Sequence, residues 1–161
     1  MTGSEQAIYL HTHRTYLKLF TQSKCSPFFL QVNDFSVATL CAAVEQNQSL
    51  KSLNLESNRI SPDQIAELFE TIAAGGNGLI EVRVAAQAQE KMGHRVEDRI
   101  ATAVCKNGRL LRLGMSFEFP ECKQRVASHL IENVDKIRRK RLKDGIAPGS
   151  GVQWTAARTI D

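Results

Sequence analysis

The sequence predicts an α/β solenoid in which short strands alternate with backing helices, and two observations predict it. The stretch "LKSLNLESNRI", residues 50–60, spaces its apolar residues as LxxLxLxxNxI and leads into an amphipathic helical pattern. The same spacing starts again at Leu79 and once more at Leu110. A strand and a helix that return about every thirty residues are typical of leucine-rich repeats. We therefore expect a right-handed βα superhelix of ribonuclease-inhibitor-like repeats, closed by a C-terminal capping helix.

The first complete repeat shows how the pattern works. Leu53 and Leu55 are separated by a single residue, so in an extended strand both side chains point to the same side. Asn58 stands where the chain leaves that strand, and its amide can bond the backbone of the turn. A helix then begins, with Ser61 and Gln64 at the spacing of a capping box. The residues predicted to build the repeats are Leu50, Leu53, Leu55, Asn58, Leu79, Val82, Val84, Leu110 and Leu113.

The other elements follow from the same periodicities. Strands are expected near residues 53–55, 82–84 and 113–115, with an irregular strand near 17–20. Helices are expected near residues 34–46, 62–74, 94–106 and 121–141. In the last helix Val126, Leu130, Val134 and Ile137 share one face, which we expect to cover the open end of the repeat core.

Composition agrees with a single domain of 161 residues. The sequence has no run of about eighteen apolar residues and no N-terminal stretch that resembles a secretory signal, so no membrane span is expected. The four cysteines, at 25, 41, 105 and 122, form no CxxC pair. We expect buried, reduced thiols, with Cys41 on the apolar face of its helix.

Positive charge is concentrated near the C-terminus. Residues 123–143 hold eight basic side chains against two acidic ones, a net +6 in a chain whose total is +4, which leaves −2 for all other residues. Cations near a helix C-terminus complement the helix dipole, but this explains only a few of them. The excess predicts an acidic partner: a nucleic acid, an anionic membrane or an acidic protein surface.

Several motifs resemble the C-terminal leucine-rich-repeat domain of tropomodulins and leiomodins, the actin pointed-end proteins. "LNLESNRIS" at 53–61 is similar to the strand-and-turn motif of that family, and "LLRLGMSF" at 110–117 is similar to its last strand. "RVASHLIENVDKIRRKRL" at 125–142 resembles the long terminal helix, and "TYLKLF" at 15–20 resembles the strand of the preceding repeat. The likeness covers about residues 15–144.

The resemblance implies an actin-binding domain that caps filament pointed ends and limits subunit exchange. The domain is expected at 15–144 with its terminal basic helix at 121–142, between a short disordered extension at 1–14 and a disordered tail at 145–161. Family members bind tropomyosin through an extended N-terminal half, so we expect no tropomyosin binding by this chain and weak activity in isolation. The resemblance also implies a monomer in the cytoplasm, on the actin cytoskeleton at pointed ends, and in the sarcomere if this is a muscle protein.

Two places depart from the family pattern. The segment 21–36 is longer than expected, and we expect its Phe28, Phe29 and Leu30 to shield the N-terminal end of the core rather than to bind a partner. In the second repeat, Ala85 and Ala86 stand where the family tends to have an acidic residue and an asparagine. We therefore expect this surface loop to have lost polar contacts.

No catalytic or metal-binding constellation emerges. The histidines at 11, 13, 94 and 129 are scattered, and "GGNG" at 75–78 lacks the Lys and Ser/Thr of a phosphate loop. We expect no enzymatic activity, no cofactor and no metal. Two alternatives to actin binding stay open: an interaction scaffold without actin affinity, and a nucleic-acid or nuclear module built on "RRKRLK". Nucleic acid is not expected, because no aromatic residues interleave with that cluster to stack on bases.

The candidate actin-binding residues fall into two groups. One is a rim position, Arg59, which has no packing role in the predicted turn. The other is the terminal helix, where Leu142 is apolar among charges and would be covered by a partner. The full set is Arg59, Lys123, Arg125, Arg138, Arg139, Lys140, Arg141 and Leu142.

Overall fold

The computed structural model describes residues 24–25, 32–45, 47–87 and 91–144 of the chain. Strands and helices alternate along these residues. The elements are β1 (Lys24–Cys25), α2 (Asp34–Glu45), β2 (Ser52–Asn54), α3 (Pro62–Ala74), β3 (Glu81–Arg83), α4 (Gly93–Lys106), β4 (Arg112–Gly114) and α5 (Pro120–Lys143).

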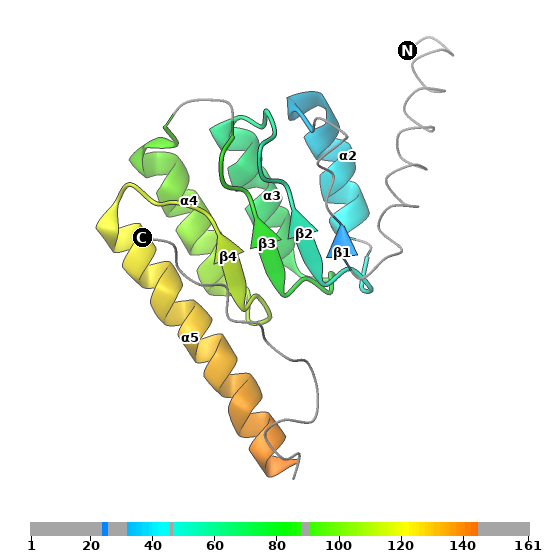
Figure 1. Cartoon of the computed structure of the whole chain (residues 1–161), viewed down its shortest axis with the longest axis vertical. Coiled ribbons are helices and arrows are strands. Elements are labelled where there is room, and N and C mark those ends of the chain that lie inside the picture. The colour runs from blue at the N-terminus through cyan, green and yellow to red at the C-terminus, as the bar shows by residue number, and fades with distance from the viewer. Residues whose placement is uncertain (1–23, 26–31, 46, 88–90, 145–161) are drawn as a thin grey trace.

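The strands form one parallel sheet in the order β1-β2-β3-β4. Leu53 of β2 pairs with Cys25 of β1 on one side and with Val82 of β3 on the other, and Val82 pairs with Leu113 of β4. Helices α2, α3 and α4 stand side by side against one face of the sheet, and α5 closes the end beside α4 and β4 (Figure 1). The predicted leucine-rich-repeat solenoid with a C-terminal capping helix is therefore confirmed.

Predicted and observed elements agree closely, with one exception. Three strands begin slightly earlier than expected, although the ladder continues beyond them, as when the Leu55 amide bonds the Arg83 carbonyl at 2.7 Å. The exception is the first strand: it was expected at 17–20, which lies outside the described residues, and the strand that pairs with β2 is β1 at Lys24–Cys25. The number of residues from Lys24 to its partner Ser52 is nearly the same as from Ser52 to its partner Glu81. β1 therefore keeps the repeat period, which a strand at 17–20 would not.

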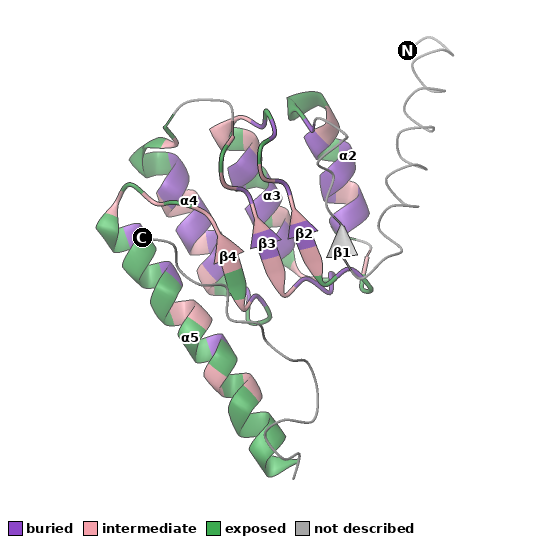
Figure 2. Cartoon of the chain, viewed as in Figure 1, coloured by how far each residue is buried: buried purple, intermediate pink, exposed green. Residues whose placement is uncertain are grey.

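The core lies between the sheet and the helices (Figure 2). The predicted repeat residues fill it: all are 0–3% exposed except Leu113, which is half-buried. Leu113 lies on β4, the last strand of the sheet, where no further repeat covers it. Cys41 is buried as expected, and so is Cys122. Burial raises the pKa of both thiols, because a low-polarity surrounding disfavours the thiolate.

Amide side chains fasten successive repeats to one another. The Asn58 amide donates to the Leu55 carbonyl at 2.9 Å, and its oxygen accepts from the Val32 amide of the preceding repeat at 2.9 Å. Gln87, at the corresponding place in the next repeat, makes the equivalent bonds: it donates to the Leu55 and Val84 carbonyls and accepts from the Ile60 amide. The second repeat therefore keeps the contacts that Asn58 makes in the first, while Ala85 and Ala86, where polar contacts were expected to be lost, have no polar side chain.

A second set of asparagines lies where the helices lead back to the strands. Asn47, Asn77 and Asn107 recur at equal intervals along the chain. The Asn47 and Asn107 oxygens each accept two backbone amides of the following turn, and the Asn77 oxygen accepts the Leu79 amide. The Asn107 amide also donates to the Ile72 carbonyl of the preceding repeat at 3.0 Å. These residues were missed from the sequence, although their spacing repeats the period of the leucines.

The expected capping box of α3 is absent. Ser61 stands at the N-cap of α3 but makes no capping bond with its side chain, and Gln64 bonds Glu67 instead. The Ser61 amide donates to the Asp34 carboxylate at 2.7 Å, so a contact between repeats replaces the local box.

In α5 the expected face packs, with one exception. Val126 is buried and Leu130 and Ile137 are half-buried, but Val134 is 47% exposed and Asn133 is buried in its stead. Asn133 packs inward because its amide bonds the carbonyls of Asn107 and Leu110, at 2.9 and 3.0 Å. A rule that looks only for apolar residues could not select it.

The remaining expectations lie outside the described residues: the extension 1–14, the segment 17–20, the apolar cluster 28–30 and the tail 145–161.

Candidate functional site

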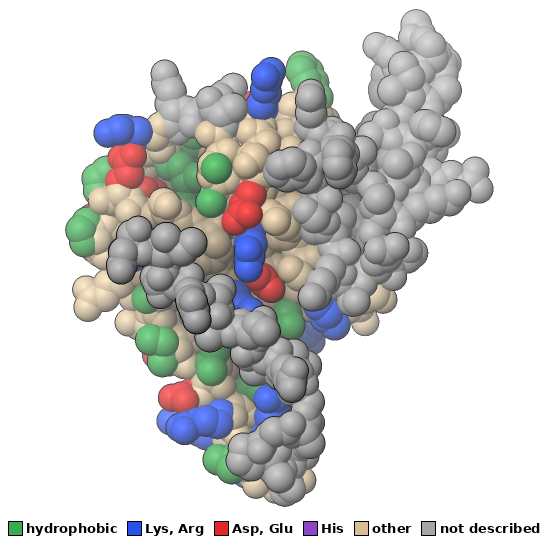
Figure 3. All heavy atoms as spheres, in the orientation of Figure 1, with side chains coloured by type: hydrophobic (Ala, Val, Ile, Leu, Met, Phe, Trp, Pro, Cys, Tyr) green, Lys and Arg blue, Asp and Glu red, His purple; other side chains and the backbone are tan. Residues whose placement is uncertain are grey.

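Most of the candidate residues lie on α5, the longest helix of the described chain. It begins beside the edge of the sheet where the strands end, runs antiparallel to the strands, and continues past the edge where they begin (Figure 1). We call these the carboxyl edge and the amino edge. The last turns of α5 carry Arg138, Arg139, Lys140, Arg141 and Lys143, all exposed, and we call this group the basic end of α5. Figure 3 shows Lys and Arg side chains gathered on that part of the molecule.

The first turns of α5 are fastened to α4. Both oxygens of Glu97, a fully buried carboxylate, accept backbone amides just before α5, from Glu118 at 2.8 Å and from Phe119 at 3.1 Å. His94 adds a 3.0 Å contact to Glu121 and packs edge-on against the Phe119 ring. The direction of α5, and hence the position of its basic end, is set by these contacts.

Arg125 belongs to the same junction. Its guanidinium contacts the Asp98 carboxylate and donates to the Thr102 hydroxyl at 3.1 Å. The hydrogen bond to Asp98 raises the pKa of Arg125, so the guanidinium keeps its charge at every ordinary pH. Arg125 was a candidate for a partner contact, but the structure gives it an intramolecular role. Lys123, near the start of the same helix, is exposed.

Farther along α5, polar contacts hold the helix against the amino edge. His129 approaches the Asn107 carbonyl at 3.0 Å, and Asn133 bonds the same carbonyl and that of Leu110. Beyond these contacts the basic end projects past the sheet (Figure 1). Within it, Arg138 approaches Asp135 at 3.3 Å, an exposed pair that contributes little to folding.

The solvent face of α5 carries an apolar stripe. Ile131, Val134 and Leu142 are 64%, 47% and 63% exposed. At about 100° per residue they fall within about 80° of one another on the side opposite the buried residues. Leu142 is thus exposed as the sequence indicated. Val134 was missed because it was assigned to the packed face, and Ile131 was not singled out in the sequence.

Arg59 does not join this group. It is exposed in the turn after β2, at the carboxyl edge, where its amide bonds the Val32 carbonyl. The basic end of α5 lies beyond the amino edge. The structure therefore divides the predicted site into two surfaces at opposite edges of the sheet.

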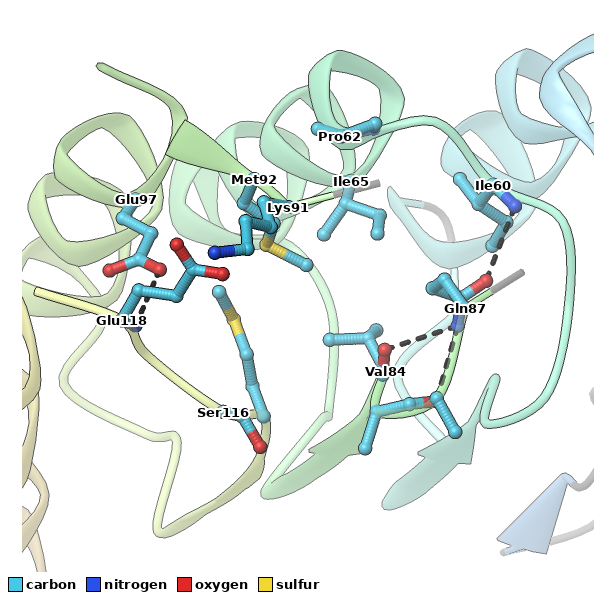
Figure 4. A pocket seen from close by; sticks show the side chains of 13 residues that line it. Ile60, Pro62, Ile65, Val84, Gln87, Lys91, Met92, Glu97, Ser116 and Glu118 are labelled. Carbon is cyan, nitrogen blue, oxygen red and sulfur yellow. Dashed lines mark hydrogen bonds between the residues drawn. The ribbon is translucent and has the colours of Figure 1, made fainter. Parts of the chain in front are cut away.

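A hollow of about 300 Å³ opens at the carboxyl edge. Figure 4 shows Gln87 on one side of it, bonded to the Ile60 backbone, and Glu97 on the other, bonded before α5. Ile65 and Met92 supply apolar surface between them. Since Gln87 and Glu97 both satisfy backbone amides, neither is available as a catalytic group.

Within the described ranges, no three His, Cys, Asp or Glu side chains lie close enough together to hold a metal ion. The helices of this part of the chain also include none of the length and apolar character that crossing a membrane requires.

Comparison with known proteins decides the family. The model of the TMOD/LMOD leucine-rich domain matches residues 15–136. The chain belongs to this family. Among relatives, tropomodulin of Caenorhabditis elegans is 32% identical over 111 residues, which are 69% of this chain and 28% of that protein. Human leiomodin-1 is 31% identical over 130 residues, 81% of this chain and 20% of that protein. The chain thus spans less than a third of the length of either relative.

Solved structures agree with this assignment. The C-terminal domain of C. elegans tropomodulin superposes with a TM-score of 0.67 at 31% identity, over 70% of this chain and 67% of that one. Actin-binding site 2 of leiomodin-1 superposes with a TM-score of 0.66 at 31% identity, over 71% of this chain and 65% of that one. Both the resemblance seen in the sequence and the predicted fold are confirmed.

Proposed function

We propose that this leucine-rich-repeat domain binds actin, and that it acts at filament pointed ends, where it limits subunit exchange. The observation that carries the proposal is the likeness in sequence and fold to a domain that bears the name of actin-binding site 2 in leiomodin-1. The family membership supports it. The expected location is accordingly the cytoplasmic actin cytoskeleton, and the sarcomere if this is a muscle protein.

The basic end of α5 is the proposed contact. Residues 123–143 carry a net charge of +6, and the five cations of the basic end are exposed. Such a charge steers an acidic partner toward the helix and speeds the encounter. Leu142 lies among these cations, 63% exposed, and can supply an apolar centre that a partner desolvates. Actin is an acidic protein, so the chemistry of the surface fits the partner that the family implies.

The proposed site is narrower than the set drawn from the sequence. Arg138, Arg139, Lys140, Arg141 and Leu142 stay in it. Lys123 is exposed but leaves it, because it lies in the first turn of α5, about 22 Å from the basic end. Arg125 leaves it, because the guanidinium is engaged with Asp98 and Thr102. Arg59 lies at the carboxyl edge and is left out of the proposed contact. We expect neither tropomyosin nor nucleic acid to be a partner of this domain, and we expect it to be a monomer.

The test compares a variant that removes four cations of the basic end with a control that removes three cations at the carboxyl edge. Replacement of Arg138, Arg139, Lys140 and Arg141 by alanine should slow association with actin by roughly tenfold at low salt and flatten its salt dependence. The control removes exposed cations at the carboxyl edge, Arg59, Lys91 and Arg95, and should change association less than about threefold. Equal losses in both variants would show that only net charge matters. No binding of actin by the unmodified chain would refute the proposal and favour a scaffold without actin affinity.

A further inference from the structure

The helix-to-strand loops at the amino edge carry a net positive charge. The described loops are 47–51, 75–80 and 107–111, and their charged residues are Lys51 and Arg109, both exposed. The charged residues at the ends of the adjoining helices and strands are the exposed cations Lys106 and Arg112 and the carboxylates Glu45 and Glu81, so the edge as a whole is basic. The described loops at the carboxyl edge are balanced instead, with Glu56 and Glu118 against Arg59 and Lys91. The two edges of one sheet therefore differ in charge, and the basic edge is the one past which α5 extends.

Two of these cations are held in place over the middle loop. The Lys51 ammonium donates to the Gln48 carbonyl at 3.0 Å, and a methyl group added at Gly78 would lie 2.8 Å from its nitrogen. From the other side, the Arg109 guanidinium donates to the Asn77 carbonyl at 3.1 Å. The side chains of the first and third loops thus converge on the second. Their positions are set before a partner arrives, which lowers the entropy lost on binding.

The amino edge is continuous with the basic end of α5. His129 and Asn133 bond the carbonyl of Asn107, inside the third loop. Lys136, one turn on, places its ammonium 3.4 Å from the Asn133 oxygen and so lies beside the same loop. From Lys136 onward α5 carries the basic end outward. The cations of the loops and those of the helix therefore belong to one continuous surface.

We propose that the amino edge, through Lys51, Lys106 and Arg109, forms part of the contact with actin together with the basic end of α5. The inference rests on the proposed function, because the acidic surface that it assigns to this edge is that of actin. The proposed contact then has two parts, the amino edge and the basic end of α5, and the acidic partner lies in the angle between the sheet edge and the projecting helix. Arg59 and the carboxyl edge then face away from this contact.

The experiment compares two triple variants that remove equal charge. One is Lys51→Gln, Lys106→Gln and Arg109→Gln at the amino edge. The other is Arg59→Gln, Lys91→Gln and Arg95→Gln at the carboxyl edge. Both leave the basic end of α5 intact, and circular dichroism with thermal melting checks the fold of each. Association with actin is measured by stopped flow at low and at physiological salt.

The amino-edge variant should associate about five- to tenfold more slowly at low salt and should lose much of the salt dependence, whereas the carboxyl-edge variant should change less than about twofold. If Arg109→Gln lowers the melting temperature, Lys106→Glu alone tests the same surface, because Lys106 is an exposed side chain at the end of α4. The inference is overturned if association of the amino-edge variant is unchanged, or if both variants lose equally. The proposed function still stands in either case, provided that the unmodified chain binds actin. Loss of binding to a single-stranded RNA probe, with actin binding retained, would also overturn it and would assign the edge to nucleic acid.

Discussion

Asn133 should contribute more to the stability of the domain than its apolar neighbour Val134. The Asn133 amide is 1% exposed and bonds the carbonyls of Asn107 and Leu110, at 2.9 and 3.0 Å. In the Asn133→Ala variant those two bonds are lost inside the protein, although His129 still approaches the Asn107 carbonyl. A buried polar group left without its partner costs about 1–3 kcal/mol. Alanine recovers about 0.5 kcal/mol through its higher helix propensity. The expected net loss is therefore about 0.5–2.5 kcal/mol.

Val134→Ala is the matched control on the same helix. Its side chain is 47% exposed, so the variant should change the free energy of unfolding by less than about 0.5 kcal/mol. Urea unfolding followed by circular dichroism measures both variants, and each kcal/mol should shift the melting temperature by roughly 3–6 °C. A larger loss for Val134→Ala than for Asn133→Ala would refute the reasoning. It would mean that Val134, and not Asn133, points toward the core.

Three other predictions concern the scaffold. Glu97→Gln should lower stability by about 1–3 kcal/mol, because the amide replaces one of two oxygens that accept the Glu118 and Phe119 backbone amides; an unchanged urea midpoint would contradict this. Gly78→Ala should destabilise the domain by more than about 2 kcal/mol, because its methyl carbon would lie 2.0 Å from the Gln48 carbonyl oxygen. Gly108→Ala is the control and should be close to neutral, because a methyl carbon there has nothing within 4 Å. Similar melting temperatures for the two variants would count against the repeat packing. In a Cys25→Ser background at pH 7.5, Cys105 should react with a maleimide much faster than Cys41 and Cys122. Burial raises the pKa of those two thiols and so leaves less of the reactive thiolate. Mass spectrometry of the labelled peptides measures the order of reaction, and the opposite order would contradict the prediction.

The repeats could be predicted from the sequence because their signal is periodic. The leucines at 50, 53 and 55 recur with their partners about every thirty residues, and burial of one strand face follows directly from that spacing. The helix boundaries were equally accessible, since Pro62 marks one start and Gly75-Gly76 one end. Both glycines have positive φ, 94° and 82°, a conformation that favours glycine.

The polar contacts that hold the repeats together could not be predicted in the same way. Gln87 was not among the predicted repeat residues, yet its side chain bonds backbone groups equivalent to those that Asn58 reaches. Asn133 was passed over because a search for an apolar face assigns asparagine to solvent. In both cases the partners are backbone groups of another repeat, far away in the chain, and local patterns carry no information about them.

The functional surface shows the same division. The charge of the terminal helix is visible in the sequence, and so is the exposure of Leu142. That Arg125 is engaged by Asp98, and that Arg59 lies at the opposite edge, depends on how α5 crosses the end of the sheet. The basic amino edge became apparent only when three loops from separate repeats were placed side by side.

The most direct test of the central claim is the rate of pointed-end elongation of actin filaments whose barbed ends are blocked. We expect the unmodified chain to slow this elongation in a concentration-dependent manner. The variant with alanine at Arg138, Arg139, Lys140 and Arg141 should require a concentration about tenfold higher for the same effect, because the cations that steer actin to α5 are gone. Elongation at an unchanged rate in a large excess of the folded, unmodified chain would contradict the account.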